Sequence, residues 1–245
     1  MAIIGGRAHS MEEIHAVGEL GYPHAEISLY VPDQVEAELG QLRELKSRYG
    51  LNYLAHFPNE GNPFDLEKLK KAFVPRMKRL FELAAELGIT KGTFHCWIDS
   101  RWIAPDKARE KIGLIADMAA AADDLGILLC LENLSEKHHD FAAAFLRVPS
   151  LMMTLDIGHA QLLAKKNTSF GFIENCFSRI AHIHVHDNRG GTSVKDDLHL
   201  PLGEGVLDYP AILSLLKEKA YASTVTMEVK PAAMSKTRDE ILKYI

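Results

Sequence analysis

Short apolar runs alternate with longer amphipathic segments along the whole chain. Several runs are apolar almost throughout, as expected for strands that are covered on both faces of a parallel sheet. We predict eight strands, at Ala2–Gly5, His24–Leu29, Leu51–His56, Lys91–Cys96, Ile127–Glu132, Leu151–Asp156, Ile180–Val185 and Ser223–Val229. Eight strand–helix units in 245 residues average about 31 residues each, the length of a βαβ unit. The pattern therefore predicts a single (β/α)8 TIM barrel over residues 1–245.

The main alternative is an open doubly wound sheet. That fold binds dinucleotides through a glycine-rich turn after its first strand. Here Gly5 and Gly6 are followed by Arg7, Ala8 and His9 instead of further glycines. The barrel is therefore the preferred fold.

Capping residues mark several expected helix boundaries. The spacing of the capping box occurs at three places: Ser10–Glu13, Asp33–Glu36 and Thr237–Glu240. Asp208 followed by Pro210 also indicates a helix start. Glycines stand where four helices should end: Gly21, Gly50, Gly88 and Gly126. Pro75 interrupts the stretch Leu66–Leu87, which predicts a kink or two consecutive helices there.

Composition and charge narrow the class of protein. With 47% hydrophobic and 25% charged residues the chain has an ordinary globular composition. Its formal net charge of −5 argues against a dedicated nucleic-acid binder, which usually carries a basic stripe. Cys96, Cys130 and Cys176 form no CxxC motif, so we expect a reducing compartment, and we expect Cys96 to be inert core. No signal-peptide or membrane-span pattern is evident, and the expected location is the cytoplasm.

Histidines and carboxylates gather at the predicted carboxyl ends of six consecutive strands. In order along the chain they are His56, His95, Glu132, Asp156 with His159, His182 with His184, His186 and Asp187, and Glu228. Asp197 and His199 follow in the loop after the seventh strand. In a barrel these strand ends face one mouth, where active sites are built. We therefore expect these side chains to converge.

A divalent cation would explain this convergence. Glu132, Asp156 and Glu228 each follow an apolar strand, where unpaired carboxylates are costly to desolvate and repel one another. A cation supplies the opposite charge, and neutral imidazoles complete its ligands. Of the alternating His182, His184 and His186, we expect one or two to reach the site while the others pack or hydrogen-bond. The histidines without a partner pattern are expected at the surface or behind the site: His9, His15, His24, His138 and His139.

Two features of the mouth allow two interpretations each. Glu26, near the end of the second strand, either hydrogen-bonds substrate or orients a metal ligand. Trp97 and Trp102, after the fourth strand, either wall the pocket or pack beneath a loop.

The motifs LEN at strand five, DIGH at strand six, HVHDN at strand seven, DLHLPLGEG after it and MEV at strand eight are similar to those of a known superfamily. They resemble the xylose isomerase-like TIM barrels, which include sugar phosphate isomerase/epimerase-like proteins and the endonuclease IV family. The resemblance implies a central metal site of Glu132, Asp156, His184 and Glu228. His184 is chosen because the family histidine stands three residues before the acidic residue, here Asp187.

The endonuclease branch adds five metal ligands. The matching positions here are His56, His95, His159, Asp197 and His199. The resemblance therefore implies between one and three divalent ions, of zinc, manganese, cobalt or magnesium.

The resemblance favours a metal-dependent isomerase or epimerase of a small sugar, sugar phosphate or related α-hydroxycarbonyl. Glu132 and Glu228 would move the proton, and His159, Lys230 and Glu26 would bind the substrate. The partner would be a sugar-like small molecule, with no membrane or nucleic acid, and a homodimer is the commonest assembly.

The alternative is a multi-zinc phosphodiesterase of the endonuclease IV type that cleaves at abasic sites. The nine matched ligand positions favour it. The acidic loop YVPDQVEAELGQ and the KDD sequence beside His199 disfavour it, because duplex binding needs basic contacts to phosphates. A non-enzymatic sensor is a third possibility, which no motif supports.

Overall fold

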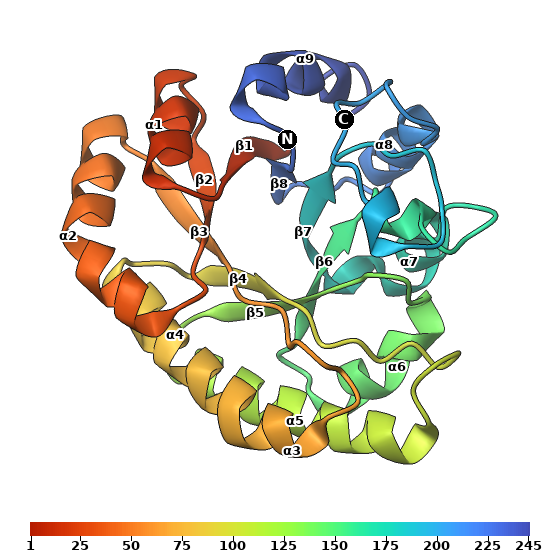
Figure 1. Cartoon of the computed structure of the whole chain (residues 1–245). Coiled ribbons are helices and arrows are strands. Elements are labelled where there is room, and N and C mark those ends of the chain that lie inside the picture. Colours follow the sequence, from red (N-terminus) through yellow and green to blue (C-terminus); the bar gives the residue numbers. More distant parts are fainter.

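The computed structural model describes residues 1–245, except for the side chain of Val194. Eight parallel strands close into one barrel in chain order, and helices surround it (Figure 1). The strands are β1 Ile3–Ala8, β2 His24–Ser28, β3 Asn52–His56, β4 Lys91–Phe94, β5 Leu128–Glu132, β6 Met152–Asp156, β7 Ile180–Val185 and β8 Thr224–Met227. β1 pairs with β8 and closes the ring. The predicted (β/α)8 TIM barrel is confirmed, and each predicted strand is present with small shifts at its ends.

The helices follow the strands on the outside of the barrel. They are α1 Met11–Glu19, α2 Pro32–Tyr49, α3 Leu66–Lys68, α4 Val74–Glu86, α5 Pro105–Asp123, α6 His138–Arg147, α7 Ser169–Cys176, α8 Tyr209–Glu218 and α9 Pro231–Ile241. A π-helical turn, Leu69–Phe73, joins α3 to α4, and Pro75 lies in the first turn of α4. Where a kink or two consecutive helices were predicted, the structure has one uninterrupted helical run whose regular pattern changes at the π-helical turn just before Pro75.

Two of the predicted helix starts are confirmed. The Ser10 hydroxyl accepts a hydrogen bond from the Glu13 amide at 3.2 Å, and the Asp208 carboxylate accepts one from the Ala211 amide at 3.3 Å. All four glycines expected at helix ends adopt positive φ: Gly21, Gly50, Gly88 and Gly126. This left-handed conformation is the one that favours glycine after a helix.

The other two capping boxes were wrong. α2 begins at Pro32, so Asp33 lies inside the helix, and α9 begins at Pro231, so Thr237 lies well within it. In both cases proline sets the helix start, because its fixed φ suits the first turn and it has no amide hydrogen to satisfy.

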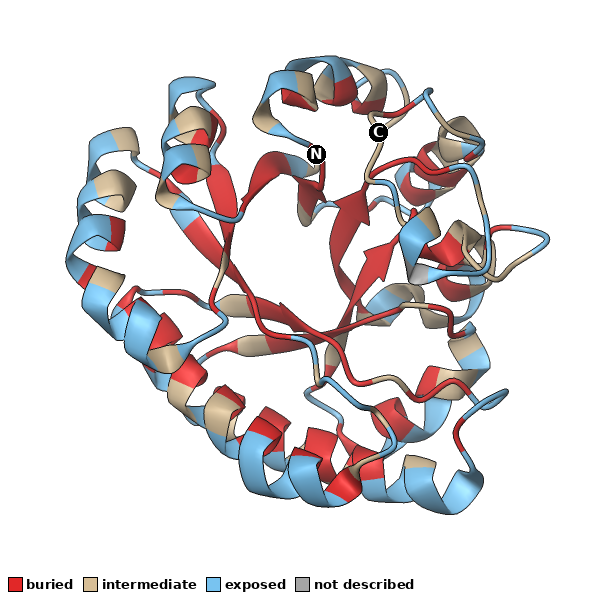
Figure 2. Ribbon diagram, in the orientation of Figure 1, coloured by how far each residue is buried: buried red, intermediate tan, exposed pale blue. Residues whose placement is uncertain are grey.

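The apolar core lies between the outer faces of the strands and the inner faces of the helices. Figure 2 shows the barrel strands and the inward sides of the helices buried, with the outward sides of the helices exposed. Inside the barrel the buried side chains are largely polar, and Thr93 and Thr154 hydrogen-bond across it at 2.8 Å. Buried polar groups need partners. The barrel axis is therefore a column of paired polar side chains that leads to the mouth.

Among the helices described here, none combines the length and the apolar character that crossing a membrane would need.

Candidate metal centre and adjoining cavity

Four side chains form a central cluster at the carboxyl end of the barrel. Glu132 ends β5, Asp156 ends β6, His184 lies in β7 and Glu228 directly follows β8. Each offers a ligand atom that lies within 4.8 Å of those of the other three. His184 Nδ1 is 3.0 Å from Glu132 Oε1, 3.4 Å from Glu228 Oε1 and 3.8 Å from Asp156 Oδ2. The strand ends thus bring together the four residues of the predicted central site.

A second group shares Glu132 with the central cluster. His56 Nε2 and His95 Nε2 lie 3.3 Å and 3.1 Å from Glu132 Oε2. The Nδ1 of His56 donates to the Phe57 carbonyl at 2.9 Å, so Nε2 carries the lone pair of the neutral ring. Both imidazoles therefore present a nitrogen to the same carboxylate oxygen.

A third group closes one side of the mouth. Asp197 Oδ2 lies 3.2 Å from His159 Nε2 and 3.1 Å from His199 Nε2. His186 completes the group, with Nε2 3.8 Å from Asp197 Oδ1, and the four ligand atoms again lie within 4.8 Å of one another. All nine predicted ligand positions are therefore gathered at the mouth, in three adjoining groups.

The electrostatics of the mouth couple its acids to its imidazoles. Burial opposes ionisation of Glu132, but the imidazoles of His95 and His184 outweigh it and hold the pKa of this carboxyl well below its usual range. Burial also opposes ionisation of Glu228, and His184 is the main group that lowers the pKa of this carboxyl, to about 2. Arg7 assists, with Nε 3.2 Å from Glu228 Oε1. The carboxylates are therefore held ionised although they are buried.

The donor set fits a divalent cation. Glu132 Oε2 is buried and accepts no hydrogen bond from the described residues, although two imidazole nitrogens face it. Buried carboxylates together with neutral imidazoles form a mixed oxygen and nitrogen donor set that zinc, manganese or cobalt accepts. The buried histidine, glutamate and aspartate clusters thus fit a metal site.

Glu26 lies one layer deeper in the barrel, directly beneath His184. His184 Nε2 is 3.0 Å from Glu26 Oε1 and 2.9 Å from its Oε2, and His182 Nε2 is 2.9 Å from Oε2. Burial opposes ionisation of Glu26, but His184 and His182 hold the pKa of this carboxyl well below its usual range. Of the three alternating histidines, His184 and His186 thus reach the clusters and His182 hydrogen-bonds behind them.

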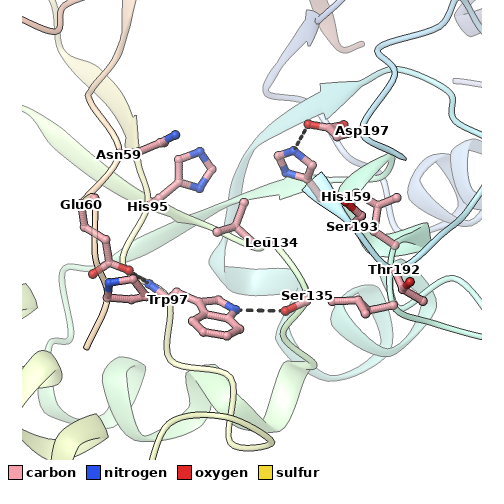
Figure 3. Close-up of a pocket in the computed structure, with 14 residues that line it drawn as sticks. Asn59, Glu60, His95, Trp97, Leu134, Ser135, His159, Thr192, Ser193 and Asp197 are labelled. Carbon is pink, nitrogen blue, oxygen red and sulfur yellow. Dashed lines mark hydrogen bonds and ion pairs between the residues drawn. The ribbon is translucent and has the colours of Figure 1, made fainter. Parts of the chain in front are cut away.

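A cavity of about 420 Å³ opens beside the second and third groups, and His95, His159 and Asp197 line it. Figure 3 shows His95 and His159 pointing toward it from opposite sides, with Trp97 and Ser135 on its wall. Trp97 Nε1 donates to Ser135 Oγ at 3.0 Å. Trp97 therefore walls the pocket, whereas Trp102 does not line it and is 56% exposed.

An ion pair supports the same wall. Glu60 accepts a hydrogen bond from the Trp97 amide at 2.7 Å and is paired with the fully buried Lys111 at 2.8 Å. Among the described residues that line the cavity there is no lysine or arginine. The lining is therefore polar and apolar without a fixed positive charge.

Lys230 and Glu26 lie apart from this cavity. Lys230 is exposed just before α9, and Glu26 is fully enclosed beneath His184. His159 does line the cavity. Of the three residues predicted to bind substrate, only His159 lies at the cavity. A contact between Lys230 and substrate stays a prediction.

The remaining histidines occupy varied positions. His9 and His15 are exposed, and so is His139, while His138 is half-buried. His24 lies inside the barrel, where its Nε2 is 3.2 Å from Thr226 Oγ1. Cys96 is buried, and burial raises the pKa of its thiol well above the usual range, which fits the expected inert core position.

Three contributors to the site were not predicted, namely Arg7, Glu60 and Lys111. Arg7 was considered only as a departure from a glycine motif, and Glu60 and Lys111 carried no motif. His186 was one of three alternating histidines, of which one or two were expected at the site. For His186 the strand period of two was a usable signal, because it places His186 on the same face as His184. The ion pairs of Arg7 and Glu60 depend on contacts between distant parts of the chain, which no local pattern reveals.

Comparison with known proteins gives one family and several structural likenesses. The sequence model of the family described as "Xylose isomerase-like TIM barrel" matches residues 14–243. The chain is 28% identical to the uncharacterized protein MJ1311 of Methanocaldococcus jannaschii over 220 residues. This alignment covers 82% of the chain and 72% of MJ1311.

Two solved structures illustrate the likeness in fold. A D-tagatose 3-epimerase-like protein superposes with a TM-score of 0.80 at 24% identity, over 98% of this chain and 96% of the other. The IOLI protein with a bound zinc atom gives a TM-score of 0.80 at 16% identity, over 99% of each chain. At these identities the likeness concerns the fold.

Proposed function

The chain belongs to the xylose isomerase-like TIM barrel family, and on that premise we propose that it is a divalent-metal-dependent isomerase or epimerase of a small sugar-like α-hydroxycarbonyl compound. The observation that carries the proposal is the convergence of Glu132 and Glu228 on one buried cluster with Asp156 and His184. The two groups beside this cluster line a cavity of a size suited to a small polar molecule, through His95, His159 and Asp197.

The proposed residue roles follow from these contacts. A divalent cation held by Glu132, Asp156, His184 and Glu228 would polarise the substrate carbonyl and acidify the neighbouring C–H. Glu132 acts as the base that removes this proton and Glu228 as the acid that returns one, or the reverse, according to which face of the substrate each meets. Arg7 holds the carboxylate of Glu228 in place through its 3.2 Å contact.

The cavity supports an uncharged substrate. Its wall combines Trp97, a flat apolar surface for a sugar ring or chain, with hydrogen-bonding groups on Ser135 and Glu60. No lysine or arginine of the described lining is available to bind a phosphate. The D-tagatose 3-epimerase-like protein with the same fold is consistent with a free ketose as substrate.

The experiment is solvent exchange at the substrate carbon. Protein loaded with Mn²⁺, Co²⁺ or Zn²⁺ is incubated with D-tagatose or D-fructose in D₂O, and deuterium next to the carbonyl is measured by NMR. We expect exchange in the wild-type protein and its loss in Glu132→Gln and in Glu228→Gln. Glu67→Gln, an exposed glutamate paired with Lys71, is the control. Exchange that persists in both site variants would remove the proposed roles, and wild-type protein inert toward a panel of ketoses would remove the substrate class.

The second candidate is a multi-zinc phosphodiesterase. One observation favours it, namely that all nine ligand positions implied by the endonuclease branch lie together at the mouth. Against it stand the net charge of −5 and a cavity lining without cations among the described residues. Cleavage of a duplex with one abasic site at physiological salt, at a rate above that of Asp197→Asn, would reverse the ranking.

A further inference from the structure

The third group at the mouth contains one imidazole more than the resemblance implies. His159, Asp197 and His199 are the implied ligands, and His186 adds a fourth side chain whose ligand atom lies within 4.8 Å of theirs. We propose that His186 closes this site as a fourth protein ligand, so that a cation here clamps the loop between β7 and α8 instead of activating water. The proposal concerns metal coordination and does not depend on the reaction proposed above.

The position of His186 is enforced by its surroundings. Its side chain is fully buried, and its ring stacks on that of His199 with centroids 4.1 Å apart and planes 10° from parallel. A Cβ at Gly158 would come within 2.2 Å of the ring, so the glycine provides the space that the imidazole occupies. Nε2 faces Asp156 at 3.1 Å and Asp197 at 3.8 Å. The nitrogen is therefore directed between the central cluster and the third group.

The number of protein ligands distinguishes two uses of zinc. A tetrahedral zinc site with four protein ligands is structural, whereas a catalytic zinc site keeps three and leaves a position for water or substrate. The central cluster differs, because its three carboxylates and one imidazole suit an ion with up to six ligands, which keeps a position for substrate. With His159, Asp197 and His199 alone, the third group would have an open position. With His186 it has three imidazoles and one carboxylate, the number of ligands that a tetrahedral ion would take.

The loop that this site would hold covers the mouth. Asp187 anchors its base by accepting amide hydrogen bonds from Gly203 and Gly205, both at 3.0 Å, and from Leu207 at 3.1 Å. The middle of the loop supplies Asp197 and His199, the latter with a φ of 47°. That left-handed conformation is unfavourable for a residue with a Cβ and needs compensating contacts.

The same loop forms part of the cavity wall through Thr192, Ser193 and Asp197. A cation that joins Asp197 and His199 to His159 and His186 would therefore fix the middle of the loop to its own start at the end of β7 and to the turn after β6. Its role would be to shape the pocket.

The decisive experiment uses Co²⁺ as a spectroscopic probe in the full-length protein. Four-coordinate tetrahedral Co²⁺ absorbs visible light far more strongly than five- or six-coordinate Co²⁺. We expect a strong band in the wild-type protein that disappears in His199→Gln and also in His186→Gln. His24→Gln, which removes a buried imidazole elsewhere in the barrel, should keep the band.

Two outcomes would overturn the proposal. One is a wild-type protein that binds Co²⁺ at this site without the tetrahedral band, which needs no variant to fold. The other is a band that is lost in His199→Gln but retained in His186→Gln. Release of the ion to a chelator should be at least about tenfold faster in His186→Gln, because groups that only orient a metal ligand already contribute on this scale.

Proteolysis tests the clamp separately. Arg189 and Lys195 are exposed trypsin sites in the same loop. Metal removal or His186→Gln should accelerate cleavage there, as read by mass spectrometry, and equal cleavage with and without metal would refute the clamp. A protein without epimerase activity could still pass both tests, so failure of the proposed function and failure of this inference are distinguishable.

Discussion

Glu26 lies beneath the central cluster, and its replacement tests whether an enclosed carboxylate sets the metal affinity. His184 Nε2 donates to Glu26, which leaves Nδ1 directed toward Glu132, Asp156 and Glu228. A carboxylate behind a histidine ligand fixes the tautomer and raises the basicity of the ligating nitrogen. We therefore expect metal affinity at the central cluster to depend on Glu26 although Glu26 touches no cation.

The size of the effect depends on what replaces the carboxylate. In Glu26→Gln the amide oxygen can still accept from His184, while the amide nitrogen faces His182. His182 can respond by moving its proton to Nδ1 and donating to Thr224 Oγ1, which lies 2.6 Å away. Only the charge-assisted part of the bond is then lost, and we expect about tenfold weaker metal binding, or about 1.4 kcal/mol.

Glu26→Leu offers no acceptor, so His184 loses its orientation as well. We expect about a hundredfold loss, or about 2.7 kcal/mol. The assay is competition for Zn²⁺ or Co²⁺ with a chelator of known affinity, followed by isotope-edited NMR of the imidazole nitrogens to read the tautomer of His184. Glu60→Gln, a buried paired glutamate away from His184, is the matched control. Unchanged affinity in Glu26→Leu, or equal losses in both Glu26 variants, would refute the reasoning.

Three further predictions concern stability and are checked by chemical denaturation. Lys111→Met should cost about 3–5 kcal/mol because it leaves the enclosed Glu60 without its partner, and adding Glu60→Gln should recover most of this. Burial lowers the pKa of His24 from 6.5 to about 3, so its contribution to the free energy of unfolding is complete above pH 6.5 and is lost as the pH falls toward 3. When the pH is lowered from 6.5 to about 4, the free energy of unfolding of His24→Gln should therefore fall by about 3 kcal/mol less than that of the wild-type protein. Gly158→Ala should cost about 1–3 kcal/mol, because the added methyl group overlaps the ring of His186; an unchanged midpoint would contradict this.

The barrel could be predicted because each strand is recognisable from its own sequence, as a short apolar run. Strands such as β5 and β6 are mainly apolar and end in a single carboxylate, Glu132 or Asp156, so the same change in polarity marks the strand end and the site residue. In a closed barrel of parallel strands, all carboxyl ends of the strands lie at the same end of the barrel, however the helices pack around it. This is why the carboxylates could be expected at one mouth from the strand pattern, whereas the choice of His184 among three alternating histidines came from the family resemblance.

Contacts across the barrel could not be predicted in this way. β1 continues past Gly5 to Ala8, and only this extension places Arg7 beside Glu228. Glu60 and Lys111 come from a loop and a helix 51 residues apart, and their pairing depends on how α5 packs. Helix starts at Pro32 and Pro231 were missed because capping spacing was given more weight than proline.

The choice between sugar chemistry and phosphodiester cleavage depends on charge and on open coordination positions. Hydrolysis in a multi-metal site needs cations that can bind water and phosphate oxygens together. A third site closed by His186 would have no position left for either, and the described cavity lining offers no lysine or arginine to replace it. The two features come from different places, the residue directly after β7 for the histidine and the loops after β3 to β7 for the lining. If His186 closes the third site, both features favour an uncharged sugar at this mouth, and the Co²⁺ spectrum of the wild-type protein tests the closure directly.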